Sequence, residues 1–148
     1  MSYDDNVTQA MRANLAKARR CWAQFSRMLR SEKALPKVCG VFYKATIQAV
    51  LLFGSETWNL VPSGMACLEG FHLRAAWRMS GTRPWKRPDS MWKYPNLEKV
   101  LQDVGLQSIS HYIGVRRQHI ANFIVNRTIF QLCLEGVRKC ESAHCQFW

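Results

Sequence analysis

The chain has 148 residues, of which 48% are hydrophobic, and this predicts one globular domain and excludes disorder throughout. Its 21 Lys and Arg residues against 10 Asp and Glu residues give a formal net charge of +11. That excess favours an anionic partner such as nucleic acid or an acidic membrane surface, unless it acts only to keep the chain in solution. The longest apolar run is broken by Lys44 and Gln48 and is too short to span a bilayer, so we expect no membrane partner.

The first predicted helix has a single apolar stripe. Asn6 to Gln9 fits a capping box at its start, with Asp4 and Asp5 near the positive end of the helix dipole. The two aspartates after Tyr3 also resemble the metal-binding turn of a polymerase. However, the aromatic residue is in the wrong register and no strand precedes the pair, so we interpret them as part of the cap. The stripe recurs at steps of three and four: Met11, Leu15, Ala18, Trp22, Phe25 and Leu29.

Two further helices complete a predicted three-helix bundle over residues 1–81. One begins at Pro36 and stops at Gly54, and it is apolar on most sides, which places it at the centre of the bundle. Its apolar positions are Val38, Phe42, Ala45, Ala49 and Leu52. The other ends at Gly81 and has one apolar face, formed by Met65, Leu68, His72, Ala75 and Met79.

Residues 82–95 are predicted to form a long loop, because they contain three prolines and show no periodicity. Two interpretations remain open. The loop can clamp phosphates while its rings stack on bases, or Trp85 and Trp92 can anchor it onto the bundle. Cationic and aromatic side chains alternate along it: Arg83, Trp85, Lys86, Arg87, Trp92, Lys93 and Tyr94.

Residues 96–136 predict two more helices, and residues 137–148 predict a polar, poorly ordered tail. The first helix runs from Asn96 to Val104 and closes at Gly105, and the second begins near Ser108. With no strand pair predicted, the fold class is all-α, a small bundle of about five helices with one long loop rich in Pro, Trp and Arg. The inward residues of the last helix are expected to be Ile109, Ile113, Ile120 and Ile124.

The first helix is also strongly basic on its polar side. No acidic residue occurs between Thr8 and Ser31 to balance the charge. A helix can place such side chains in a row along a phosphate backbone, although a solvated helix face is the commoner explanation for one charged run. The candidate phosphate contacts are Arg12, Arg19, Arg20, Arg27 and Arg30, with Arg83, Trp85, Lys86, Arg87 and Trp92 of the loop as a second contact.

Other candidate sites are weaker. Cys133, Cys140, His144 and Cys145 have zinc-ligand chemistry, but their spacing fits no usual zinc motif, so we predict no metal site and no cofactor. Three histidines, His72, His111 and His119, lack a neighbouring nucleophile and are interpreted as packing or surface residues. Most of the six cysteines fall in helical patterns as small apolar residues. With no secretory signal, this predicts reduced thiols and an intracellular location, cytoplasmic or nuclear.

Residues 100–114 loosely resemble a DNA-binding helix-turn-helix, with Gly105 in the turn. Such a regulator would prefer one DNA site and would contact bases with the residues from Ser108 to Val115. The pattern is common by chance, so this hypothesis ranks behind the others.

A longer resemblance covers nearly the whole chain. Leu-Leu-Phe-Gly-Ser-Glu-Thr-Trp-Asn-Leu at 51–60, followed by the helix from Leu68 to Gly81, resembles the region after the polymerase palm in non-LTR retrotransposon reverse transcriptases. The family typically has Tyr where this chain has Phe53. The remainder of the motif is present, from Gly54 to Trp58. Residues 2–30 and 116–136 continue the likeness.

This resemblance implies a thumb and the start of a linker, which hold the template–primer duplex without catalysing its extension. The palm, with its catalytic aspartates and Mg²⁺, would lie before Met1, so the likeness implies a truncated fragment that is not an enzyme. The expected partner is RNA or an RNA–DNA hybrid, bound without regard to sequence. Glu56 is expected to pair with Arg74 or Arg78, in a structural segment that includes Gly54 and Trp58.

The leading alternative is a helical scaffold or protein-interaction module, or an inert remnant with inherited charge. Apolar faces left uncovered without the palm would allow self-association.

Overall fold

The computed structural model describes residues 3–86 and 91–127, together with positions 131 and 135. The prediction of an all-α bundle is confirmed, and the described residues form five helices when α2, η1 and α3 are counted as one continuous helix. The elements are α1 (Tyr3–Ser31), α2 (Pro36–Phe42), the π-helical η1 (Tyr43–Gln48), α3 (Ala49–Leu51), the 3₁₀ turn η2 (Ser55–Thr57), α4 (Pro62–Ser80), β1 (Trp85–Lys86), β2 (Trp92–Lys93), α5 (Leu97–Val104) and α6 (Ile109–Val125).

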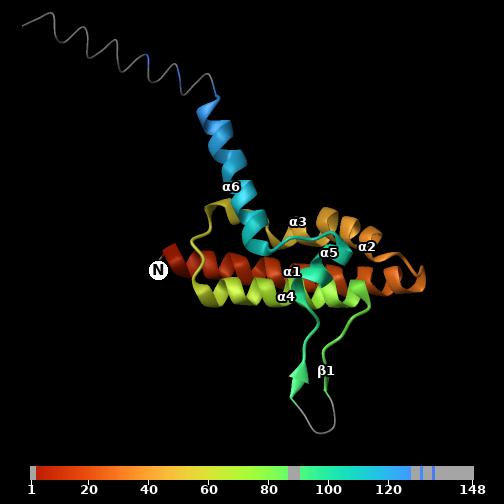
Figure 1. The fold of residues 1–148 in the computed structure, drawn as a ribbon. Coiled ribbons are helices and arrows are strands. Elements are labelled where there is room, and N and C mark those ends of the chain that lie inside the picture. The colour runs from red at the N-terminus through yellow and green to blue at the C-terminus, as the bar shows by residue number, and fades with distance from the viewer. Residues whose placement is uncertain (1–2, 87–90, 128–130, 132–134, 136–148) are drawn as a thin grey trace, which may run out of the picture.

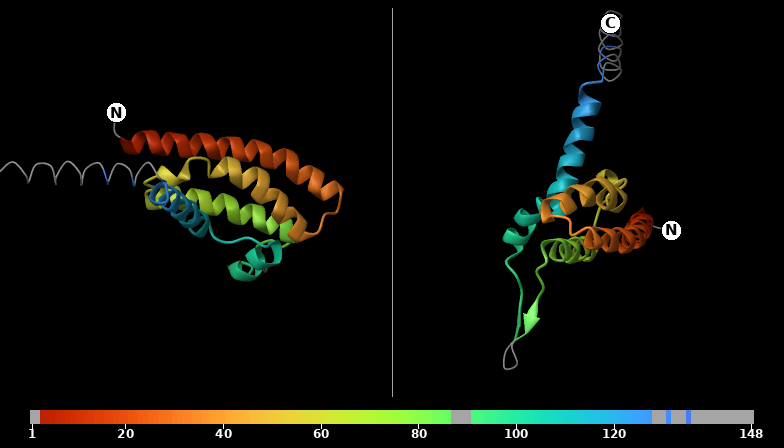
Figure 2. Two further views of the ribbon diagram at one scale, coloured as in Figure 1. Left: turned by 90° about the horizontal axis from the view of Figure 1, so that it is seen from above. Right: turned by 90° about the vertical axis from the view of Figure 1, so that its right-hand side faces the viewer.

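Three long helices form the body of the molecule. Helices α1 and α4 lie side by side and run in the same direction, while α2–η1–α3 packs against both in the opposite direction (Figures 1 and 2). Helix α5 packs against α2 and α4. The two-stranded ribbon and the outer half of α6 project from this body in opposite directions (Figure 2).

The core lies between the three long helices. Leu15, Ala18 and Trp22 of α1 are buried as the predicted stripe requires, whereas Phe25 is only half-buried. Trp22 meets Tyr43 edge to face, with ring centroids 5.7 Å apart. This geometry is favourable for aromatic pairs because the positive ring edge faces the negative ring face.

The start of α1 differs from the prediction. The helix includes Tyr3, Asp4 and Asp5, so Asn6 lies inside it and does not cap it. Acidic residues are favoured in a first helical turn, which accounts for the longer helix. The two aspartates are therefore on a helix and not on a polymerase-type hairpin.

Of the apolar positions expected in the second helix, Leu52 is buried, but Val38 and Phe42 are exposed. The other buried apolar positions of this helix are Cys39, Tyr43, Ile47 and Leu51. These recur every four residues, a step that overshoots one turn of an α-helix. The wider turn of η1 keeps them on one face, because a π-helix has more residues per turn.

A close approach fixes α2 against α5. A Cβ atom on Gly40 would overlap the carbonyl oxygen of Val104, so only glycine allows the two helices to pack at this separation. Helices α4 and α5 end at Gly81 and Gly105, as predicted.

The last helix is only partly packed. Ile109 and Ile113 are buried, but Ile120 and Ile124 are 44% and 50% exposed, so the predicted inward face is wrong beyond its first turns. The physical reason is that α6 leaves the bundle, and no other described helix packs against its outer half (Figure 1). The predicted tail over residues 137–148 and the residues proposed as zinc ligands lie outside the described residues.

Candidate nucleic-acid interface

The basic residues of α1 fall on two edges of the helix. Arg12, Arg19 and Arg30 are separated by seven and eleven residues, close to two and three full turns, so they share one edge. Arg20 and Arg27 occupy the next edge. All five are exposed, and the Arg27 Nε donates to the Ala23 carbonyl of its own helix at 3.1 Å. The predicted single row is therefore two rows.

A groove runs along the contact between α1 and α4, and we call it the arginine groove. It has a volume of about 600 Å³ and aromatic walls that include Trp22, Phe71 and Trp77. Helix α4 contributes two arginines one turn apart, and the segment after it contributes a third. The five arginines that line the groove are Arg19, Arg30, Arg74, Arg78 and Arg83. Arg12 lines a separate small cavity on the same contact, near the start of α4.

Among the described residues, no carboxylate lines the arginine groove. Among the residues that the structure describes, the one ion pair joins Glu56 to Arg116, and neither lies at the groove. Five guanidinium groups thus share one concavity without a described counter-charge. Because like charges repel and arginine stays charged at any ordinary pH, this arrangement favours an anion in the groove.

The assignment of Arg74 and Arg78 as structural partners of Glu56 is wrong. Glu56 Oε1 accepts from Arg116 of α6, at 3.3 Å from Nη1. The reason is distance along α4. Glu56 lies just before the start of this helix, and Arg74 is 12 residues, or about 18 Å, beyond its first residue.

The Gly54–Trp58 segment does hold two helices together, but they are α3 and α6. Gly54 has a φ of 73°, the left-handed region that favours glycine, and this turn redirects the chain after α3. Arg116 donates to the Leu52 carbonyl at 3.2 Å, and Arg117 donates to the carbonyl of the buried Trp58. The segment is thus a structural joint in this fold.

The predicted loop contains a short antiparallel ribbon. Trp85 pairs with Lys93 and Lys86 pairs with Trp92, so each face of the ribbon presents one indole and one ammonium group. The Lys93 Nζ lies 5.5 Å from the Trp85 ring centroid, a cation–π geometry. The expectation of no strand pair is therefore wrong. These two-residue strands are too short to show an alternating pattern in the sequence.

The ribbon is anchored by a residue other than the predicted ones. Tyr94 stacks on Trp77 of α4, with ring centroids 6.1 Å apart. Trp85 and Trp92 are 47% and 57% exposed, so they do not bury themselves against the bundle. The exposed ribbon lies next to the arginine groove because Arg83 and Pro84 connect the two. Arg87 lies outside the described residues.

The three histidines within the described residues differ sharply. His111 and His119 are exposed, while His72 is 1% exposed and uses both ring nitrogens. Its Nε2 lies 2.9 Å from the Gln107 carbonyl and its Nδ1 lies 3.0 Å from the Tyr43 hydroxyl. Burial lowers the pKa of His72 to about 4, and burial also raises the pKa of Tyr43. These groups support the core, as predicted for a packing residue.

The helix-turn-helix hypothesis does not fit the geometry. The backbone amides of Ile109 and Ser110, at the start of α6, donate to Glu69 Oε1 at 3.0 and 3.3 Å. Ile109 and Ile113 are buried. The end of the helix that would have to read base edges therefore faces α4.

No group of His, Cys, Asp and Glu in the described part of the chain could hold a metal ion. Within that same part, every helix is too short or too polar to cross a membrane. Neither a family model, nor a curated protein, nor a solved structure matches this chain. The reverse-transcriptase resemblance therefore stays a prediction from the residues that carry it.

Proposed function

We propose that this chain binds RNA or an RNA–DNA hybrid without sequence preference, through phosphate contacts in the arginine groove. The observation that carries the proposal is the set of five arginines in one concavity with no carboxylate among the lining residues. Arginine presents a planar fork of donors that fits phosphate oxygens in a bidentate manner. Contacts of this kind fix position on a nucleic acid and carry no base information, which is why we expect no sequence preference.

The proposed role is non-catalytic. It follows the resemblance to the thumb and linker of non-LTR retrotransposon reverse transcriptases, in which catalysis belongs to the palm. The ribbon formed by β1 and β2 supplies a second contact through the exposed Trp85 and Trp92, because aromatic rings stack on bases of any sequence and neighbouring cations hold the backbone.

A salt series with a labelled RNA–DNA hybrid that has 5′-hydroxyl ends tests this proposal. The slope of log K against log salt should be several units, at about 0.9 per phosphate contact by analogy with duplex DNA. Replacing both Arg19 and Arg74 with alanine should reduce the slope by about 1.8. The matched control replaces Arg20 and Arg27, two exposed arginines of the other α1 edge, and should change it less. A flat slope for the unaltered chain would overturn the proposal.

One observation favours a protein-interaction module as the second candidate. The outer half of α6 exposes an apolar surface that includes Ile120, Phe123 and Ile124. Such a surface is typical of a binding site for another protein or a second copy of the chain. Sedimentation analysis distinguishes the two candidates, because a scaffold should self-associate or recruit protein while binding the hybrid only weakly at physiological salt.

A further inference from the structure

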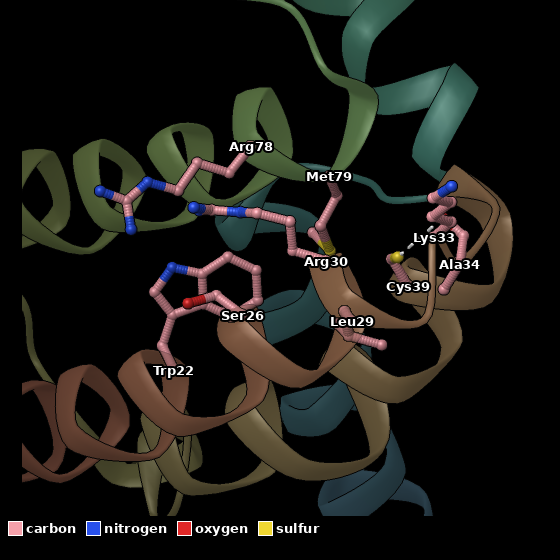
Figure 3. A pocket seen from close by; sticks show the side chains of 9 residues that line it. All are labelled: Trp22, Ser26, Leu29, Arg30, Lys33, Ala34, Cys39, Arg78 and Met79. Carbon is pink, nitrogen blue, oxygen red and sulfur yellow. Dashed lines mark hydrogen bonds between the residues drawn. The ribbon is translucent and has the colours of Figure 1, made fainter.

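A second cavity adjoins the arginine groove and shares part of its wall. It has a volume of about 250 Å³ and a mixed lining, in which Leu29, Cys39 and Met79 are apolar and Ser26 and Lys33 are polar. Trp22, Arg30 and Arg78 line both cavities. Figure 3 shows the side chains of Arg30 and Arg78 extending in the same direction, toward the side of the view on which the indole of Trp22 lies. The arginine groove and this smaller, mixed cavity thus meet at two arginines.

Arg30 and Arg78 together favour a ligand with concentrated negative charge. They come from α1 and α4, they are exposed, and no described carboxylate lies within 4.0 Å of either. An interior phosphodiester group of a nucleic-acid strand carries a single negative charge. A phosphate monoester carries about −1.5 to −2 charges at pH 7 and has three acceptor oxygens, so it can bridge both guanidinium groups.

The shape of the site restricts the ligand further. The groove is a concavity between two packed helices, whose axes are typically about 8–10 Å apart, so the body of a duplex stays outside it and only phosphates on the duplex surface reach its arginines. A single nucleotide can enter. The smaller cavity is below the roughly 300–1,000 Å³ typical of whole-ligand pockets, which suits it to hold one part of a ligand, such as a base.

We propose that the two cavities together bind the phosphorylated terminal nucleotide of a nucleic-acid strand. The terminal phosphate lies between Arg30 and Arg78, and the base enters the smaller cavity beside Met79. This inference rests on the proposed function and deepens it, because it makes a strand end the preferred ligand. Interior phosphates occupy the remaining arginines of the groove.

The test compares RNA–DNA hybrids with a short single-stranded overhang, of either polarity, whose end is phosphorylated or carries a hydroxyl group. We expect the phosphorylated form to bind about tenfold more tightly in at least one polarity, in line with the strength of charge-assisted hydrogen bonds. Equal affinities in both polarities would overturn the inference. If log K still fell steeply with log salt, that result would leave the proposed function intact. A flat salt dependence would overturn both the proposed function and this inference.

Matched variants connect the preference to the site. Arg78→Ala and Arg30→Ala should each abolish the tenfold difference, and Arg78→Lys should restore only part of it, because an ammonium group cannot bind in a bidentate manner. Arg20→Ala removes the same charge from the other edge of α1 and should preserve the difference. Circular dichroism checks that each variant remains helical. A preference that persisted in Arg78→Ala and Arg30→Ala would overturn the assignment.

Competition between adenosine monophosphate and inorganic phosphate tests whether the smaller cavity binds a base. Adenosine monophosphate should displace the phosphorylated hybrid at a concentration about tenfold lower than inorganic phosphate does, since only the nucleotide has a base to bury. Ser26→Phe places a ring at the half-buried wall of this cavity and should remove that advantage while leaving the salt slope unchanged. Equal displacement by the two competitors would overturn the placement of the base and with it the terminal-nucleotide assignment.

Discussion

Helix α4 places two kinds of polar group on two of its faces. His72 points into the core and both of its ring nitrogens have partners, at 2.9 and 3.0 Å. Arg74 and Arg78, on the exposed face, line the arginine groove without a described carboxylate. Buried polar groups are stable only when their hydrogen bonds are complete. Exposed charges gathered without counter-charges instead favour a ligand, so the two faces separate residues that hold the fold from residues that we propose to bind a ligand.

His72, on the inward face of α4, has a defined protonation state. The Gln107 carbonyl can only accept, so His72 must carry its proton on Nε2 and donate there. Nδ1 is then an acceptor, and the Tyr43 hydroxyl donates to it. The neutral imidazole therefore satisfies every polar atom of the pair, and Tyr112 packs its ring edge to face against His72, with centroids 6.3 Å apart.

Removing His72 should have the largest effect on stability. His72→Ala leaves a cavity and deprives the Tyr43 hydroxyl and the Gln107 carbonyl of their partner, so we expect a loss of about 3–5 kcal/mol in the free energy of unfolding. Urea denaturation measures it. Arg74→Ala, two residues along the same helix, is the control and should cost less than about 0.5 kcal/mol. Similar losses in both variants would contradict the contrast between the two faces.

Acid should lower the free energy of unfolding through the protonation of His72. The pKa of His72 is about 4 in the fold and about 6.5 when unfolded, so between these values the unfolded chain binds more protons. The contribution of neutral His72 to the free energy of unfolding is fully present above pH 6.5 and is lost as the pH falls toward 4. The total loss is of the order of 3 kcal/mol. Denaturation midpoints at pH 7, 5.5 and 4.5 measure it. In the His72→Gln variant, the loss of stability between pH 6.5 and 4 should be smaller by this amount. An unchanged pH dependence would mean that another group titrates.

Local patterns in the sequence were enough to predict most helices. The α1 stripe, the helix starts near Asn96 and Ser108, and the ends at Gly81 and Gly105 all depend on neighbouring residues, and the structure has each of them. The inward face of the second helix was not predictable in this way. Its buried positions recur every four residues through the π-helical segment, a step that α-helical periodicity does not predict, and apolar residues on several sides hid it.

The candidate site could be predicted only in part. The arginines of α1 are evident from the sequence, but their neighbours in the groove are not. Arg19 and Arg74, 55 residues apart, line the same groove because α1 and α4 pack in parallel, and no local pattern encodes that packing. Similarly, the apolar spacing of Ile120 and Ile124 states which face of α6 is apolar, but not whether another helix covers it.

The Glu56–Arg116 pair should have an intermediate effect. Both side chains are partly exposed, so we expect Glu56→Gln and Arg116→Ala each to cost about 1 kcal/mol or less. A double-mutant cycle should give a coupling energy of about 0.3–1 kcal/mol for this pair. The same cycle between Glu56 and Arg74 or Arg78 should give none. Coupling with Arg74 or Arg78 would instead restore the pairing expected from the sequence.

The smallest effect on stability should come from the paired arginines of the groove. Replacing both Arg30 and Arg78 with alanine removes two neighbouring positive charges that have no described counter-charge. At low salt the free energy of unfolding should rise by a few tenths of a kcal/mol, up to about 0.5, because self-repulsion is relieved. In high salt the gain should vanish, because screening has already weakened the repulsion. Thermal denaturation at the two salt concentrations measures both values, and a loss of 2 kcal/mol or more would show that these arginines hold the bundle together. Stability that is kept or gained while nucleic-acid binding falls is the result that separates a binding face from a structural one.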